Sequence, residues 1–403
     1  MEIMSETQFE ALEGALKGDG ARAAFDKLEE VLLAARKYPQ LFEALLMRKR
    51  HALGLPLQGG DTFREIPEAL QDEVEDYYVE VCRRIGSLYL ADGDILSGWP
   101  YFRAIDEPAL VASALEKWAP PGPEAESPVP GSAGASLDAI VDIALSQGAN
   151  PRRGYELVLS QYGVCRAITI LEHQFPHTGD VKETCGAMLV RRLHNDLVLS
   201  LAHDISRREG TSPPETDVKK LIESRPWLFE NHGYHVDISH LQSVIRIAAS
   251  LKDREALDRA LQMTEYGRRL PRDFQQNDRA PFDDFYNDYR IFLQAMLGIG
   301  ADGAVRYFTQ KAERFQVDEE GKHFPGEVLV YLLDRLGRHG EAIAAHVKYL
   351  KDVRGPLSAA PSLLELSSRA GDYSRLLEVS KEKDDILLFA AGLLERDRAR
   401  PAD

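Results

Sequence analysis

Repeated pairs of amphipathic helices separated by short polar turns constrain the fold of this chain most strongly. Residues 326–353 contain two apolar-striped helical segments on either side of Gly337-Arg-His-Gly340, and residues 362–397 alternate short helical segments with polar turns. A single helical hairpin cannot bury its apolar face alone, so neighbouring hairpins must stack. No alternating strand pattern joined by Asn-Gly or Asp-Gly turns is present. We therefore expect an all-α fold of stacked antiparallel helix pairs, an α-solenoid.

The N-terminal part follows the same pattern. A long helix is expected over 67–90, a short one around 99–104, and another after Pro108. Small and large residues alternate around the joint between the first two of these helices, at Gly86, Tyr89, Gly93, Trp99 and Phe102. This joint resembles the helix–turn–helix unit of tetratricopeptide (TPR) repeats. Residues 227–244 resemble uncharacterised bacterial helical-repeat proteins, a likeness that implies a helical-repeat fold and no particular activity.

One segment interrupts the helical pattern and indicates a domain boundary. Residues 119–137, APPGPEAESPVPGSAGASL, are rich in proline, glycine and serine. Such a composition is typical of a flexible linker. We therefore expect an N-terminal helical unit over 1–118, a linker over 119–137, and a C-terminal helical-repeat domain over 138–403.

Charge and composition exclude several classes of function. The 403 residues carry a formal charge of −16, which disfavours nucleic acid and anionic membranes as partners. No signal peptide or membrane-spanning segment is expected, and three widely spaced cysteines suit a reducing compartment, so we expect a cytoplasmic protein. No phosphate-binding loop, dinucleotide fingerprint or nucleophile elbow is present.

The middle of the chain predicts two helices with a histidine-bearing core. We expect helices over 154–173 and 180–208. On the second helix, His194 shares an arc with the leucines and should face the core, whereas His203 should face water. Asp204 lies among the leucines on this arc, so burial would require an ion pair or a hydrogen bond.

Histidines are concentrated just after these helices. Seven of the eleven lie between residues 173 and 240, and the run ends in His232-Gly-Tyr-His235-Val-Asp237-Ile-Ser-His240. His235, Asp237 and His240 could form part of a zinc or other divalent-metal site, or an acid–base site, with His232 or His194 completing it. The alternative is that Asp237 caps a helix over 238–253 while His240 is a hydrogen-bonded core residue. No metal-binding motif is present, so no cofactor is expected.

A second group of candidates follows, dense in charge and aromatic rings. Tyrosine and arginine are favoured at binding hot spots, so this stretch suggests a recognition surface. Pro281 suits the first turn of a new helix, with Asp283 and Asp284 at its positive end. Asp284 and Asp288 lie one turn apart, where they could share a cation or pair with arginines. The predicted binding residues are Tyr234, His235, His240, Tyr266, Arg268, Arg269, Asp283, Asp284 and Tyr286.

These observations favour a non-enzymatic helical-repeat protein that binds a protein or peptide in a groove between stacked helices. The alternative is a metal-dependent hydrolase or lyase with His235, Asp237 and His240 at its centre. The sequence does not distinguish the partner, the substrate or the oligomeric state.

Overall fold

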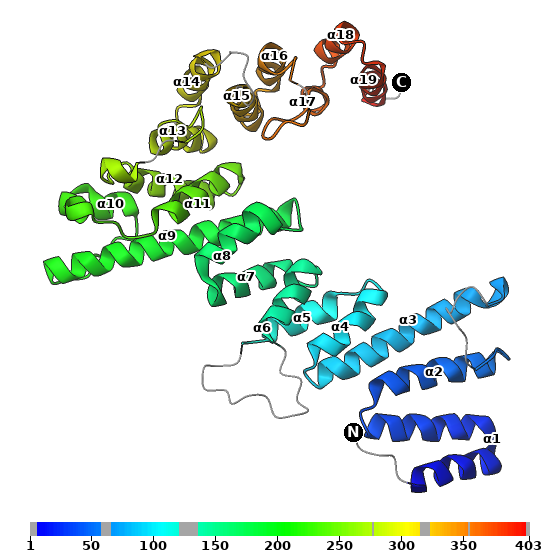
Figure 1. Ribbon diagram of the computed structural model, residues 1–403. Helices are drawn as coiled ribbons and strands as arrows, with labels where there is room; N and C mark the ends of the chain where they lie inside the picture. Colours follow the sequence, from blue (N-terminus) through cyan, green and yellow to red (C-terminus); the bar gives the residue numbers. More distant parts are fainter. Residues whose placement is uncertain are drawn as a thin grey trace. The chain divides into compact units, whose positions relative to one another are not determined.

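The computed structural model describes residues 6–57, 66–120, 136–275, 278–314, 323–353 and 355–399. Within these ranges the regular secondary structure is entirely helical, with nineteen α-helices and four short 3-10 or π segments (Figure 1). Most helices pack against the next helix along the chain. The predicted all-α fold of stacked helix pairs is therefore confirmed.

The chain divides into two compact units, Met1–Gln161 and Tyr162–Asp403. The first, unit 1, comprises α1 (Glu6–Ala34), α2 (Tyr38–Ala52), α3 (Glu68–Ala91), α4 (Ile95–Ala104), α5 (Ala109–Lys117), α6 (Leu137–Val141), the π segment η1 (Asp142–Ser146) and α7 (Pro151–Gln161). Non-helical backbone at Gly20 kinks α1. Residues 121–135 of the predicted linker lie outside the described residues.

The division between units follows residue 161, whereas the sequence suggested residues 119–137. The reason is a shared core, because helices from both sides of that stretch pack together in unit 1. Buried Phe102, Val111 and Leu115 contribute to the same apolar cluster as Ile140 and Leu157.

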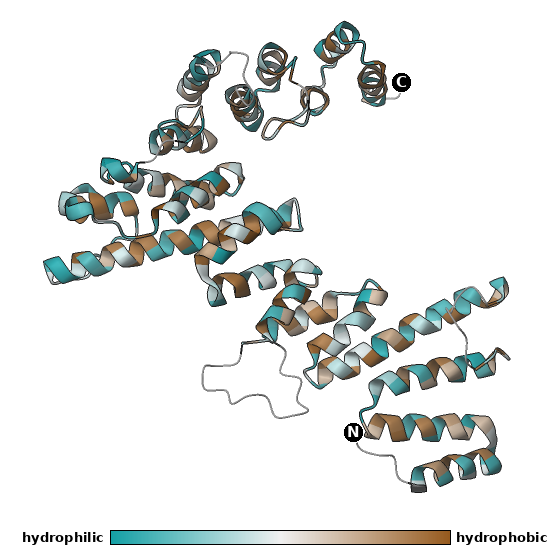
Figure 2. Ribbon diagram, viewed as in Figure 1, coloured by the Kyte–Doolittle hydropathy of each residue, from teal (hydrophilic) through white to brown (hydrophobic). Residues whose placement is uncertain are grey.

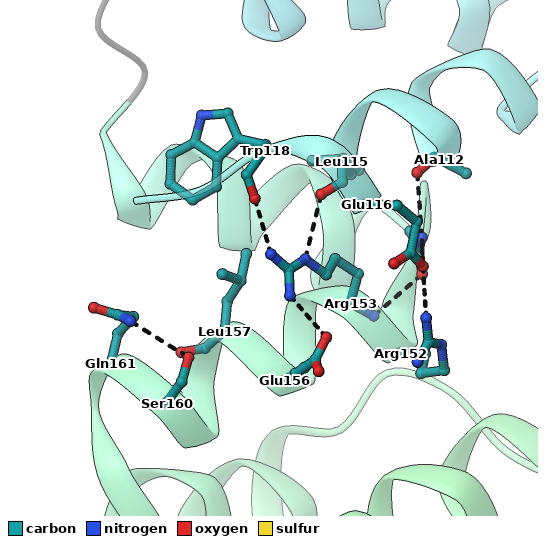
Figure 3. Close-up of polar contacts among 11 residues, drawn as sticks. Ala112, Leu115, Glu116, Trp118, Arg152, Arg153, Glu156, Leu157, Ser160 and Gln161 are labelled. Atoms are coloured by element: carbon teal, nitrogen blue, oxygen red, sulfur yellow. Dashed lines mark hydrogen bonds and ion pairs between the residues drawn. The ribbon is translucent and has the colours of Figure 1, made fainter. Parts of the chain in front are cut away.

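Polar contacts also join α5 to α7 within unit 1 (Figure 3). The guanidinium of Arg153 donates to the backbone carbonyls of Leu115 at 3.3 Å and Trp118 at 2.8 Å, and to Glu156 at 2.8 Å (Figure 3). These carbonyls lie at the C-terminal end of α5, where regular helical donors run out, although the Trp118 N–H also donates to the Leu115 carbonyl at 3.3 Å. Arg153 therefore caps α5 from the neighbouring helix.

The joint that resembles a TPR repeat is formed by α3 and α4. Asp92 ends α3, Gly93 adopts a left-handed backbone with φ of 79°, and the Asp94 side chain caps α4. A Cβ at Gly86 would lie 2.6 Å from the Phe102 ring, so the small residue allows the ring to pack on the helix. This geometry is compatible with a TPR-like repeat.

Unit 2 contains the remaining helices. They are α8 (Gly163–Thr169), the π segment η2 (Ile170–Gln174), α9 (Asp180–Glu209), α10 (Val218–Glu223), the 3-10 segment η3 (Pro226–His232), α11 (Ile238–Ser250), α12 (Arg254–Gly267), the 3-10 segment η4 (Arg272–Phe274), α13 (Phe285–Met296), α14 (Ala301–Arg314), α15 (Phe324–Arg335), α16 (His339–Tyr349), α17 (Leu363–Ala370), α18 (Ser374–Glu382) and α19 (Ile386–Arg398).

Two helix predictions for this region had different outcomes. The helix expected over 154–173 is interrupted, because Gly163 adopts φ of 80°, a conformation that ends a regular helix. The helix expected over 180–208 is α9, where His194 is buried and His203 is exposed, as predicted. Figure 2 shows both apolar and polar residues on α9. In the described residues, no helix is long and apolar enough to span a membrane.

Candidate functional site

His235 has a buried side chain that lies between Tyr266 and Asp204. Its side chain is 3% exposed, with Nε2 3.5 Å from an Asp204 carboxylate oxygen. Its Nδ1 lies 3.1 Å from the Tyr266 hydroxyl, and its backbone N–H donates to that hydroxyl at 2.8 Å. Burial lowers the pKa of His235, although Asp204 opposes this effect. The ring is therefore neutral at neutral pH.

Asp204 itself departs from the sequence expectation. Its side chain is 45% exposed and faces His235, so the carboxylate lies at the edge of the leucine core and not within it. The position of Asp204 in the helical pattern predicts the direction of its side chain only to within about one residue's rotation around the helix axis. A rotation of that size is enough to keep the Asp204 carboxylate in contact with water.

Asp237 caps α11, as the alternative to a metal site predicted. Its carboxylate accepts hydrogen bonds from the backbone N–H groups of Ser239 at 2.9 Å and His240 at 3.1 Å. Hydrogen bonds, led by that from the Ser239 hydroxyl, lower the pKa of Asp237. No group of three or more His, Cys, Asp or Glu side chains in the described residues is placed to hold a metal ion. His235, Asp237 and partly buried His240 are thus not brought together as a metal-binding group.

Tyr266 and Tyr286, predicted for the recognition surface, belong to the core of unit 2. They are 0% and 1% exposed, and burial raises the pKa of both phenols. A Cβ on Gly267 would lie 2.1 Å from the Tyr286 ring, so the ring packs directly on the backbone of α12. Both rings lie where α12 packs against α13, which removes them from any binding surface.

The aspartates near the start of α13 belong to an internal ion network. The Lys311 ammonium lies 2.7 Å from Asp283 and 2.6 Å from fully buried Asp288. Asp288 also accepts hydrogen bonds from the Tyr307 hydroxyl at 2.6 Å and the Asp284 backbone N–H at 2.8 Å. Burial opposes the charge of Lys311, but the hydrogen bonds to Asp283 and Asp288 prevail and raise the pKa of Lys311.

This network corrects two expectations for the start of α13. The cation is Lys311 from α14, and it pairs with Asp283 and Asp288, whereas the sequence suggested that Asp284 and Asp288 share a cation or pair with nearby arginines. The helix begins at Phe285, so Pro281 precedes its first turn. Asp284 is exposed at the N-cap position without a side-chain capping bond. The network holds the segment before α13 against α14.

Four of the predicted binding residues are exposed, namely Asp284, described above, with Tyr234, Arg268 and Arg269. Tyr234 is 58% exposed and packs edge-on against Phe274, with ring centroids 5.6 Å apart. Arg268 and Arg269 are exposed in the turn after α12, where Arg268 pairs with Glu265 at 3.1 Å. Their part in binding stays a prediction.

A cationic pocket that the sequence did not suggest lies elsewhere in unit 2. It has a volume of about 430 Å³ and is lined by Lys252, Arg254, Leu257, Met296, Asp334, Arg335, His339 and Arg369. These residues come from the α11–α12 junction and from α12, α13, α15, α16 and α17. We call this site the cationic pocket.

Most cations of this pocket have no carboxylate partner. Arg335 donates to the Tyr331 hydroxyl at 2.6 Å and the Leu251 carbonyl at 2.5 Å, and Arg254 donates to the Leu297 carbonyl at 3.3 Å. Neither arginine, nor Lys252, forms an ion pair within the described part of the chain. The lining therefore carries more positive than negative charge, with the Glu183 carboxylate bound to the backbone N–H groups of Lys252 and Asp253 beside it.

The one carboxylate of the pocket is already engaged. The Asp334 side chain is 9% exposed and pairs with Arg369 and with His339, whose Nδ1 lies 3.2 Å away. Backbone carbonyls fix Arg335 and Arg254, so their guanidinium groups are held in place before any ligand binds. The pocket residues are separated by up to 117 positions in the chain, from 252 to 369, so no local spacing revealed them.

Comparison with known proteins adds no family to this description. Neither the protein-family models nor the curated proteins nor the solved structures contain a match to this chain.

Proposed function

We propose that this is a non-enzymatic helical-repeat protein that binds an acidic segment of a protein partner through the cationic pocket. The observation that carries the proposal is the meeting of Lys252, Arg254 and Arg335 at one cavity without a carboxylate partner among the described residues. The chain as a whole has a formal charge of −16. A positive cavity on an acidic chain favours a compact anionic ligand.

The size and lining of the pocket favour a peptide as its ligand. Leu257 and Met296 provide apolar contact beside the cations, so the pocket suits an acidic side chain next to an apolar one. Arginine forms directed hydrogen bonds with carboxylates, and Arg335 is already oriented. The net charge of −16 on the chain weakens the case for nucleic acid as the ligand.

The test is the affinity of the full chain for a fluorescein-labelled hexaglutamate peptide, measured by anisotropy. Replacing both Lys252 and Arg254 with glutamate should weaken binding at least about tenfold, or about 1.4 kcal/mol. Binding should also weaken as salt rises, because exposed charges are screened.

The matched control is the double variant Arg268→Glu/Arg269→Glu, which makes the same charge change on the exposed turn after α12. It should leave the peptide affinity within about twofold of the unmodified chain. An equal loss in both double variants would show non-specific attraction. A loss confined to the control would move the site to the surface that the sequence predicted.

A further inference from the structure

A second cavity in unit 2 lies among α16, α17, α18 and α19. It has a volume of about 450 Å³, within the range of about 300–1,000 Å³ found for small-molecule sites. We call it the His346 cleft. Aliphatic side chains form most of its wall, including Leu350, Leu357, Leu363, Leu364, Val379 and Leu388.

His346 is the unusual member of this apolar wall. It is 9% exposed, and neither ring nitrogen has a hydrogen-bond partner in another described residue; the one polar group that interacts with the ring is the backbone of His346 itself. Leaving a buried polar group without a partner costs about 1–3 kcal/mol. Such groups are rare in native proteins and require an explanation. A ligand that hydrogen-bonds to the imidazole provides one.

The segment that carries Leu357 and Ala360 forms another part of the cleft wall, and a buried carboxylate holds it in place. Fully buried Glu327 on α15 accepts hydrogen bonds at 2.7 Å from the backbone N–H groups of both Ser358 and Ala359. Its other carboxylate oxygen lies 3.2 Å from His323 Nε2. A buried carboxylate thus fixes the segment that carries Leu357 and Ala360, so the cleft is a constructed feature of the fold.

The charged residues of the cleft point to the chemistry of the ligand. Glu365 is engaged in the capping box of α17, Asp385 caps α19, and Lys351 pairs with Glu382. Lys383 is exposed and forms no ion pair within the described residues. The polar groups left for a ligand are an imidazole and an ammonium, which together favour an anionic head group.

We propose that the His346 cleft binds a small aliphatic carboxylic acid, with its carboxylate between His346 and Lys383 and its chain against the leucines. Both ring nitrogens are covered in this structure, so the proposal requires the imidazole to turn and present one N–H to the carboxylate. Burial lowers the pKa of His346, and Lys383 acts in the same direction. A bound carboxylate would oppose both effects.

The experiment titrates the full chain, labelled with ¹³C at histidine Cε1, with sodium octanoate at millimolar concentration. The His346 signal among the eleven histidines is assigned by its loss in His346→Leu. We expect a saturable shift of that signal. Lys383→Ala should weaken octanoate binding about tenfold and leave 1-octanol binding unchanged, because the alcohol carries no charge.

A cavity-filling variant separates this site from adsorption elsewhere. Val379→Phe places a ring in the cleft and changes neither His346 nor Lys383, so it should abolish the shift. The proposal is overturned if octanoate causes no saturable shift of the His346 signal, or if Val379→Phe binds as well as the unmodified chain. Equal affinity for 1-octanol and octanoate would overturn the carboxylate head group.

Discussion

Gly267 shows how closely the core of unit 2 is packed. Gly267 has ordinary helical backbone but lies against the Tyr286 ring, so its small size is required by packing and not by conformation. A sequence shows a glycine near the end of a helical pattern and two tyrosines nearby. It does not show that one ring lies on the glycine, which is why both tyrosines were predicted to be on the surface.

We expect Gly267→Ala to destabilise unit 2 by about 1–3 kcal/mol, because the added methyl overlaps a buried ring that cannot move freely. The free energy of unfolding in urea measures this effect. Gly303→Ala on α14 is the matched control, since nothing lies within 4 Å of its Cβ position. The control should stabilise the helix by about 0.5–1 kcal/mol. A neutral result at Gly267 would contradict the packing described here.

At the level of helices, side chains from one element complete the ends of another. Asp237 caps its own helix, and this could be predicted, because the capping residue and the amides it binds are adjacent in sequence. Arg153 caps α5 from α7 and could not be predicted, because 35 residues separate it from Trp118. Local capping is readable in a sequence, whereas capping between helices depends on the tertiary fold.

Arg153→Met should destabilise unit 1 by about 1.5–3 kcal/mol, the range for hydrogen bonds to a charged group. The methionine keeps much of the apolar stem and removes the donors to the Leu115 and Trp118 carbonyls. Urea unfolding of the full chain, followed by tryptophan fluorescence, reports the change. Lys117→Met removes one positive charge from the same end of α5 and should have little effect. Equal losses of stability in both variants would mean that the missing positive charge, and not the missing hydrogen bonds, causes the destabilisation.

The same distinction explains what could be predicted of the candidate site. The helix positions, the core orientation of His194 and the Asp237 cap follow from spacing along single helices. The cationic pocket joins Lys252 and Arg254 to residues beyond position 330, which only helix stacking brings close. The division after residue 161 differs from the predicted boundary because helices on both sides of residues 121–135 contribute to one core, which composition does not show.

For the molecule as a whole, buried histidines set the response to acid. Burial lowers the pKa values of His194, His235 and His346, all in unit 2. The unfolded chain therefore binds more protons than the folded chain once the pH falls below about 6.5, the ordinary histidine value. Stability rises with pH wherever the unfolded state binds more protons, so unit 2 loses stability on acidification.

We expect the free energy of unfolding of unit 2 to decrease from pH 7.5 to pH 5.5, as hydrogen exchange of the α9 and α11 amides would show. His346→Leu removes one of the three titrating rings and should flatten this dependence. An unchanged slope in that variant would mean that His346 does not contribute. Amides of unit 1 serve as the internal comparison.

The contacts that join α5 to α7 have a practical consequence for engineering. Because the helices on both sides of residues 121–135 share one core, the length of the connection is not what holds them together. Doubling the length of a flexible connection costs only about 0.6 kcal/mol. A fluorescent or affinity tag inserted within residues 121–135 should therefore leave the core of unit 1 intact.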